Sequence, residues 1–169
     1  AMAMMGSSDF EIEDSPEAVF QFMLDHGWSD GLPVIPPTAN RVRAMLDYAQ
    51  RDASELVGYI NPDAGSATLE KIAVNAVMAG CLPEYMPVLV AAVQAMIEPA
   101  FNIHGLQTTT NPVAPLLIIN GPVREQIGLN SGRGTLGPGN RANATIGRAV
   151  RLLLLNVGGA KPWSTDMSV

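Results

Sequence analysis

The sequence has few of the residue types that most catalytic and metal sites use. Its 169 residues include one cysteine, two histidines and 10 Lys/Arg. A single cysteine excludes an internal disulfide framework and a cysteine-based zinc site, and it is consistent with a cytoplasmic protein. The chain is acidic, with a net charge of −6, and it has three Tyr and two Trp. This composition does not fit a nucleic-acid binder.

Long apolar runs are also missing. None approaches the roughly 20 residues of a membrane-spanning helix, and no leader resembles a signal peptide. The first four residues, Ala-Met-Ala-Met, resemble a remainder from an expression vector, which would put the natural start at Met5. The 47% hydrophobic content is ample for one core. We therefore expect a vector remainder and flexible N-terminus over 1–14, one globular domain over 15–160 and a C-terminal tail over 161–169.

Apolar spacing and end signals predict the helices. Ser15 and Pro16 suit the start of a first helix, Gly27 its end, and Thr38 the cap of a second. Three further helices are predicted at about 69–79, 83–98 and 140–156, and a short helical turn at 123–127. The helix at 83–98 is apolar on nearly every side. It must therefore be central in its domain or buried by another chain.

Three segments are expected to be strands. Residues 55–60 favour a short strand closed by a turn at 61–65, and residues from Phe101 onward favour the start of a second. Pro115–Asn120 is a continuous apolar run, which is typical of a strand in a covered sheet. The expected fold class is α/β or α+β, with a small sheet of about three strands packed with four to five helices.

A glycine-rich segment before the last helix is the strongest candidate for a binding site. Gly132, Gly134, Gly137 and Gly139 fall within eight residues. Glycine lets backbone N–H groups approach a ligand closely, and a helix start adds unpaired donors and a positive dipole end. Residues 101–169 hold two acidic residues against six Lys/Arg, whereas 1–100 hold 14 against four. The segment 132–143 is therefore predicted to bind an anion or a polar small molecule.

The alternative is a structural turn capped by Asn140, with the nearby arginines solvated or in ion pairs. Gly132–Gly137 satisfies G-x-G-x-x-G, but it follows no strand directly and no acidic residue lies about twenty positions later, so it is a poor dinucleotide fingerprint. Both interpretations stay open. The candidate ligand-binding residues are Arg133, Gly134, Thr135, Gly139, Asn140, Arg141, Asn143, Arg148, Thr109 and Asn111.

Cys81 and His104 are the candidate catalytic residues. Cys81 precedes a predicted helix N-terminus, where a thiolate is stabilised, although a free cysteine is more often a small buried apolar residue. His104 lies in a polar stretch and is the natural general acid or base, although a lone histidine is more often structural. Asp25, His26 and Asp30 could form a metal or acid/base cluster, but surface turn residues are the favoured interpretation. No metal is expected, and no pattern indicates a cofactor.

Four segments resemble a bacterial family, the UGSC-type proteins, named for a selenocysteine- or cysteine-Gly-Ser-Cys motif. The segments are Asp30–Thr38, Glu70–Val88, Gly121–Pro122 and Gly137–Arg148, and the likeness covers most of residues 27–166. Members of the family are longer, and this chain is similar to their N-terminal portion. The resemblance implies thiol or selenol redox chemistry, but the motif itself is missing here. It therefore implies a partner polypeptide that carries the remaining portion, or a truncated chain.

Together these features predict a subunit of a bacterial hetero-oligomeric enzyme that binds an anionic or polar small molecule at 132–143. A homo-oligomer is a further possibility, and no nucleic acid or membrane is expected as a partner. The alternative function is a non-catalytic structural subunit that stabilises a catalytic partner chain. A stand-alone small-molecule binding module is the weakest of the three, because nothing specifies its ligand.

Overall fold

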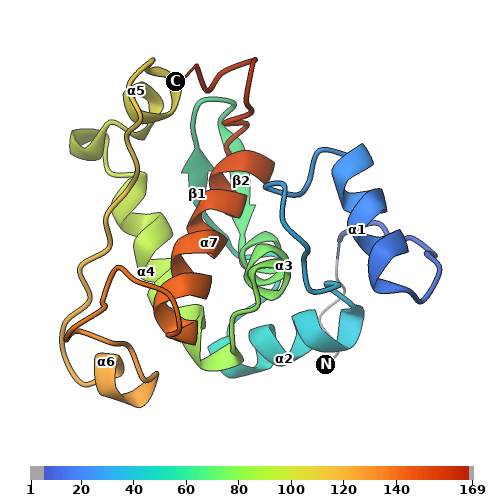
Figure 1. The fold of residues 1–169 in the computed structure, drawn as a ribbon, viewed down its shortest axis with the longest axis horizontal. Coiled ribbons are helices and arrows are strands. Elements are labelled where there is room, and N and C mark those ends of the chain that lie inside the picture. The colour runs from blue at the N-terminus through green and yellow to red at the C-terminus, as the bar shows by residue number, and fades with distance from the viewer. Residues whose placement is uncertain (1–5, 168–169) are drawn as a thin grey trace.

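The computed structural model describes residues 6–167 and has an α+β fold (Figure 1). Seven α-helices pack with one antiparallel hairpin of two strands. The elements in chain order are α1 (Pro16–Asp25), α2 (Ala39–Ala49), β1 (Leu56–Ile60), β2 (Gly65–Thr68), α3 (Leu69–Ala79), the 3-10 turn η1 (Pro83–Tyr85), α4 (Met86–Met96), the 3-10 turn η2 (Pro99–Phe101), α5 (Ile103–Thr108), α6 (Val123–Gln126) and α7 (Arg141–Asn156).

The hairpin is the whole sheet of the described chain. Strand β1 confirms the strand predicted at 55–60, and it pairs with β2, which the sequence analysis missed. The sequence of β2, Gly-Ser-Ala-Thr, has no apolar alternation that would identify it. Its first residue, Gly65, lies so close to α7 that a Cβ there would overlap the carbonyl oxygen of Val157. Contact with the end of α7 therefore fixes the position of β2.

Two of the three predicted strands are wrong. The segment from Phe101 is helical instead, as η2 and α5, because Asn102 caps the turn and its side chain accepts from the N–H of Gly105. Pro115–Asn120 is extended, but it pairs with no strand of the described chain. An apolar run of this kind predicts burial, but it does not identify the element that covers the buried side chains. Here only alternate side chains of the run face the core.

The core lies between α3 and α7, with α4 beside them. Residues Leu69, Ile72, Ala73 and Ala76 of α3 have no exposed surface, and the second half of α7 is buried from Leu152 to Leu155. Helix α4 contacts α2, α3, α7 and β1. Helix α4 is therefore covered by its own chain. Of the two predicted alternatives, a central position in the domain or burial by another chain, the structure has the first.

Only a narrow stripe of α4 reaches the surface. Pro87, Ala91, Gln94 and Ala95 are exposed, whereas the other side chains of the helix are buried. No single helix in residues 6–167 is long and apolar enough to cross a membrane. The helical stretches Pro83–Met96 and Pro99–Thr108 pass such a test only as a pair bent by 73°, by length and composition alone.

Local signals placed most helix ends correctly. The Ser15 hydroxyl accepts from the N–H three residues on, and the Asn140 amide oxygen accepts from the N–H of Asn143. Gly80 ends α3 with a φ of 90°, a left-handed conformation that suits glycine. Thr38 precedes α2 as predicted, but its side chain makes no capping hydrogen bond. A hydrophobic stripe therefore sufficed to start α2 there.

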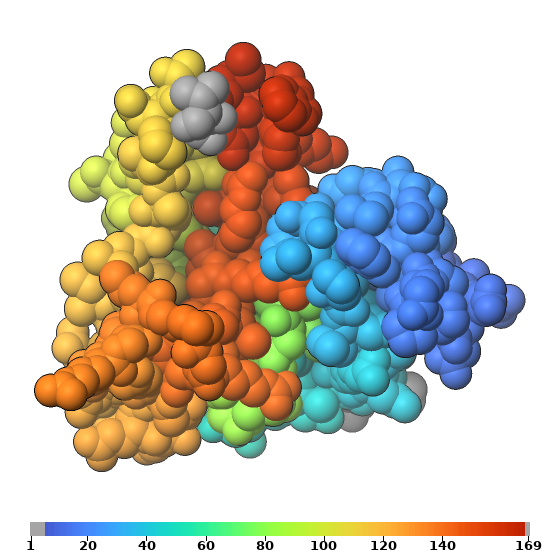
Figure 2. Space-filling model, viewed as in Figure 1, coloured from blue at the N-terminus to red at the C-terminus, as the bar shows by residue number. Residues whose placement is uncertain are grey.

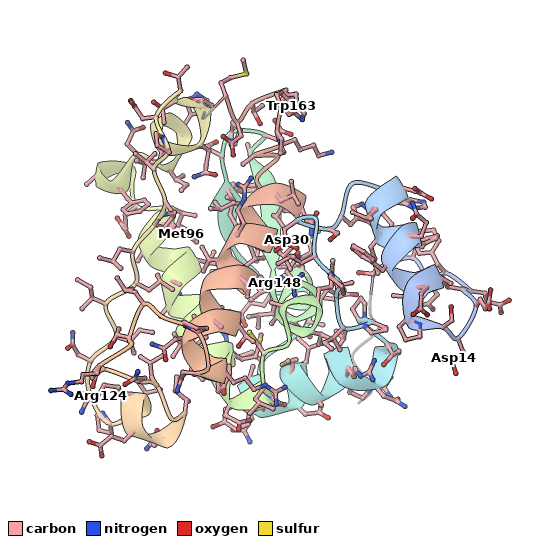
Figure 3. The ribbon with its side chains drawn as sticks, in the orientation of Figure 1. Asp14, Asp30, Met96, Arg124, Arg148 and Trp163 are labelled. Carbon is pink, nitrogen blue, oxygen red and sulfur yellow. The ribbon has the colours of Figure 1, made fainter. Side chains whose placement is uncertain are left out.

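An ion pair ties the connection between α1 and α2 to the middle of α7 (Figure 3). Arg148 donates from Nε and Nη2 to the two carboxylate oxygens of Asp30, at 2.9 and 2.8 Å. It also donates to the carbonyl oxygens of Leu32 and Pro33, at 3.2 and 2.9 Å. Burial raises the pKa of Asp30, but the hydrogen bonds and charge of Arg148 outweigh it and hold that pKa below its ordinary value.

Both ends of the described chain contact the domain. The N–H groups of Gly6 and Ser7 donate to the buried carboxylate of Glu70, at 2.9 and 3.1 Å. Near the other end, Asp166 pairs with Arg151 of α7 at 3.1 Å. Residues 1–5, where the vector remainder is expected, lie outside the described residues, as do 168 and 169 at the end of the expected tail.

We predict that Arg148→Ala lowers the free energy of unfolding by about 3 kcal/mol at neutral pH, because the carboxylate of Asp30 loses its partner while largely buried. Urea denaturation measures this. The matched control is Arg124→Ala, which removes an ion pair with the exposed Glu125 and should cost about 0.5 kcal/mol or less. Equal losses in the two variants would contradict the prediction.

The same ion pair predicts a pH dependence. The pKa of Asp30 is lowered in the folded chain, so its contribution to stability is present above the ordinary aspartate pKa and is lost as the pH falls through the folded value. The stability difference between wild type and Asp30→Asn should therefore shrink in acid. Urea midpoints measured from pH 7 down to pH 3 test this, and a constant difference would contradict it.

Candidate functional site

The glycine-rich loop before α7 is held by its own asparagines. Asn143 Nδ2 donates to the carbonyl oxygens of Asn130 and Thr135, at 2.9 and 3.1 Å, and Asn143 Oδ1 accepts from the N–H of Asn130. Asn140 Nδ2 donates to Gly128 O at 2.9 Å. The side-chain amides that were expected to bind a ligand thus form hydrogen bonds within the loop. This is the arrangement expected for a capped structural turn, the alternative interpretation.

The rest of the loop is a surface turn. Gly134 and Gly139 have φ values of 78° and 103°, which explains why glycine stands at both positions. The Thr135 hydroxyl donates to Gly132 O at 2.6 Å. Arg133 is exposed, and its guanidinium has no hydrogen bond or ion pair with any described residue. Of the candidates in this loop, Arg133 alone has a side chain free for a ligand.

Three other candidates lie away from this loop. His104 is exposed on α5, and Thr109 and Asn111 follow that helix and bond to each other, with Thr109 Oγ1 accepting from the N–H of Asn111 at 3.2 Å. Cys81 lies before the start of α4, whereas His104 follows its end. An 11-residue helix spans about 16 Å, so the structure does not bring the two candidate catalytic residues together.

The acidic and histidine residues near α1 also lie apart. His26 packs its ring against those of Phe22 and Trp28, at centroid distances of 4.1 and 4.7 Å. Asp30 pairs with Arg148, and Asp25 accepts from Gln21 at 2.7 Å. No group of three or more His, Cys, Asp or Glu side chains within residues 6–167 is placed to hold a metal ion.

Instead, the structure places Cys81 and Arg141 at one cavity. The cavity measures about 210 Å³ and lies between α2, the junction of α3 with η1, and the start of α7. Its lining residues are Ile35, Arg41, Ala44, Met45, Val77, Gly80, Cys81, Pro83 and Arg141. The side chains come from four separate segments of the chain, so the tertiary fold creates this site.

Backbone carbonyl groups hold both arginines of the cavity. Arg141 donates from Nε to Gly80 O at 3.0 Å, and Arg41 donates from Nη1 to Pro36 O at 2.9 Å. Neither guanidinium forms an ion pair with a carboxylate in the described chain. Both arginines are exposed, and each keeps most of its five N–H donors free of protein partners.

Cys81 contributes a neutral thiol to the cavity wall. Burial raises its pKa to about 11, although the hydrogen bond to Thr145 and the charge of Arg141 act in the opposite direction. The thiol donates to Thr145 O at 3.3 Å and its residue is 5% exposed. The thiolate is the nucleophilic form of cysteine. In this state the group is therefore a packed thiol next to a cationic pocket.

Sequence reasoning missed Arg41. No spacing along the chain links position 41 to positions 81 and 141. Arg141, Thr145 and Arg148 are spaced to share one face of a helix. Arg141 and the Thr145 carbonyl group meet the α3–η1 junction, at Gly80 O and the Cys81 thiol. Arg148, however, is occupied by Asp30, so Arg141 is the member of that face which reaches the cavity.

Comparison with protein-family models finds no match for this chain, and comparisons with curated proteins and with solved structures find none either.

We predict that Cys81 reacts with iodoacetamide at pH 7.5 at least about 100-fold more slowly than an exposed thiol, because burial and a raised pKa both suppress the thiolate. Mass spectrometry follows the reaction. The same chain in urea is the matched control, since the cysteine is then exposed. A folded-state rate equal to the unfolded one would show a reactive thiol instead.

Proposed function

We propose that this chain is the ligand-binding subunit of an enzyme, and that it binds a small anion in the cavity between Arg41 and Arg141. The observation that carries the proposal is the pair of arginines without carboxylate partners at one cavity. An anion bound there would receive charge-assisted hydrogen bonds from both sides, and such bonds are about twice as strong as neutral ones.

The size and charge of the cavity limit the ligand. A volume of about 210 Å³ is below the roughly 300–1,000 Å³ of sites for drug-sized molecules. Arginine matches the planar fork of a carboxylate and the oxygens of phosphate or sulfate. The positive end of the 16-residue helix α7 lies at the same wall, since that helix begins at Arg141. A small carboxylate, phosphate or sulfate fits these features.

In this proposal the glycine-rich loop has a supporting role. It turns the chain into α7 and fixes the helix start through Asn140 and Asn143, which in turn positions Arg141 at the cavity. The proposed ligand site therefore includes only the end of the predicted segment 132–143, at Arg141. Arg41 and Cys81 complete it from other elements.

The family resemblance implies a redox role, and this chain alone does not have the groups for it. Cys81 is the only cysteine, so a two-thiol or selenol-thiol reaction requires a partner that supplies the other group. We extend the proposal accordingly: this chain holds the anion, and a second subunit carries the redox-active residue. The subunit would act in a bacterial cytoplasm, as the sequence analysis expects.

A non-catalytic structural subunit is the second candidate. It is favoured by the loop, whose polar side chains are used internally, and by Arg148, which holds the chain together instead of a ligand. On this alternative Arg41 and Arg141 would neutralise acidic side chains of a partner, and free anions would not bind.

We predict that phosphate or sulfate at millimolar concentration shifts the NMR amide signals of residues 80–81 and 141–142. Arg41→Ala and Arg141→Ala should each weaken this binding at least about tenfold, since each removes one charged partner. The matched control is Arg43→Ala, which removes an exposed arginine two residues from Arg41 that does not line the cavity. The control should bind as wild type does.

The variant Arg141→Lys separates charge from geometry. It keeps the charge but not the planar fork, so it should recover part of the affinity for phosphate and less for a carboxylate. Absence of any shift in wild type, or equal weakening in the Arg43 control, would reject the anion site and leave the structural-subunit alternative.

A further inference from the structure

A second feature of the fold, separate from the cavity, is the segment between α5 and α6. Residues 112–120, here called the strap, run as an extended ribbon past α4 (Figure 1). Leu117 and Ile119 pack against the core, while Leu116 and Ile118 are 70% and 79% exposed. Burial thus alternates along the strap with the period of a β-strand. The face that it turns to solvent is as apolar as the face that it buries.

Beyond Val113, whose N–H donates to Asn111 O at 2.9 Å, the backbone of the strap has no partner in the described chain. No N–H or C=O group of residues 114–120 forms a hydrogen bond with any residue in the described part of the chain. Except at Pro115, which has no N–H, such a segment has the open donors and acceptors of an unpaired strand. An apolar helix face could cover Leu116 and Ile118, but it could not bond to these backbone groups. A partner that bonds to these groups must itself be an extended strand.

The charge distribution indicates which chain supplies that strand. Residues 99–123 contain no Asp, Glu, Lys or Arg, although the whole chain has a net charge of −6. Two copies of an acidic protein repel each other wherever their charged faces meet. The strap itself adds no charge to that repulsion. Protective charges, which usually block edge-to-edge pairing of exposed strands, are also missing here.

We propose that the strap pairs with the strap of a second copy of this chain, antiparallel about a two-fold axis. A two-fold interface requires a surface that is complementary to itself, and a neutral, alternating apolar strand has this property. With the axis at Leu117, Leu116 of one copy lies opposite Ile118 of the other. The pairing forms a two-stranded ribbon across the interface and brings the four exposed aliphatic side chains together.

The strap runs along one edge of the molecule in Figure 2, between α5 and α6. The cavity-lining residues come from α2, the junction of α3 with η1, the connection before α2 and the start of α7. None of them belongs to the strap. The pairing therefore does not rest on anion binding, and each proposal can fail without the other.

Sedimentation velocity of the full chain tests the pairing. Wild type at tens of micromolar should sediment as a species of twice the 17.9 kDa chain mass. Ile118→Lys places a charge opposite Leu116 of the other copy and should raise the dissociation constant of the dimer at least tenfold. The matched control is Leu32→Lys, which also replaces an aliphatic residue that is largely exposed, at 57%. Leu32 belongs to the connection between α1 and α2, and that connection runs on the other side of α7 from the strap in Figure 1. This variant should leave the dimer intact.

Hydrogen exchange supplies a readout specific to strand pairing. The amides of residues 116–119 should exchange more slowly as protein concentration rises, in wild type and in Leu32→Lys but not in Ile118→Lys. A monomer at these concentrations would overturn the proposal. A dimer that survives Ile118→Lys would also overturn it, because the interface would then lie elsewhere. Protection that appears only on adding neutral lipid vesicles, or only with a different protein, would assign the strap to that other partner and equally reject self-pairing.

Discussion

The ion pair between Arg148 and Asp30 is the long-range contact on which the candidate site depends. It draws the connection before α2 onto α7, and the N–H of Ile35 in that connection then donates to Met78 O at 3.1 Å. Ile35 forms one wall of the cavity, while Arg141 forms another from the same helix as Arg148. A partly desolvated pair is costly unless its geometry is good. Here the bidentate contact and two further carbonyl acceptors supply that geometry. The ion pair thereby holds two walls of the cavity, at Ile35 and Arg141, in position.

Helix α7 gathers the functions that the sequence analysis had distributed over separate residues. Its first residue supplies Arg141 to the cavity, its second turn receives the thiol of Cys81 at Thr145 O, and its middle holds Asp30 through Arg148. The glycines and asparagines before it were therefore correctly recognised as important for the start of a helix. The ligand was expected among them because a helix start and a glycine loop look alike whether or not an anion is bound.

Local chemistry could be predicted from the sequence, whereas pairing could not. Ser15, Gly80 and Asn140 each act through neighbours a few residues away, and these helix ends were found. The strand at Gly65–Thr68 depends on its contacts with β1 and Val157, which no local pattern encodes. For the same reason Arg41 was not connected with Cys81 and Arg141. Their positions become neighbours only when α2 packs beside the α3–η1 junction.

The apolar segments show what hydrophobicity alone can predict: burial, but not the element or chain that provides it. Both α4 and the strap were expected to be buried, and α4 was one of two arguments for an oligomer, the other being the family resemblance. In the structure α4 is covered by its own chain, apart from a stripe of small and amide side chains. The strap is covered on one face only, and its backbone groups are left open as well.

An apolar side chain at the surface is common and needs no partner. An apolar face that coincides with unpaired strand edges and with 25 uncharged residues, 99–123, is a different case. Backbone hydrogen bonds are directional, so a partner that pairs with these groups must be an extended strand, and the proposed site of association lies at the strap instead of α4.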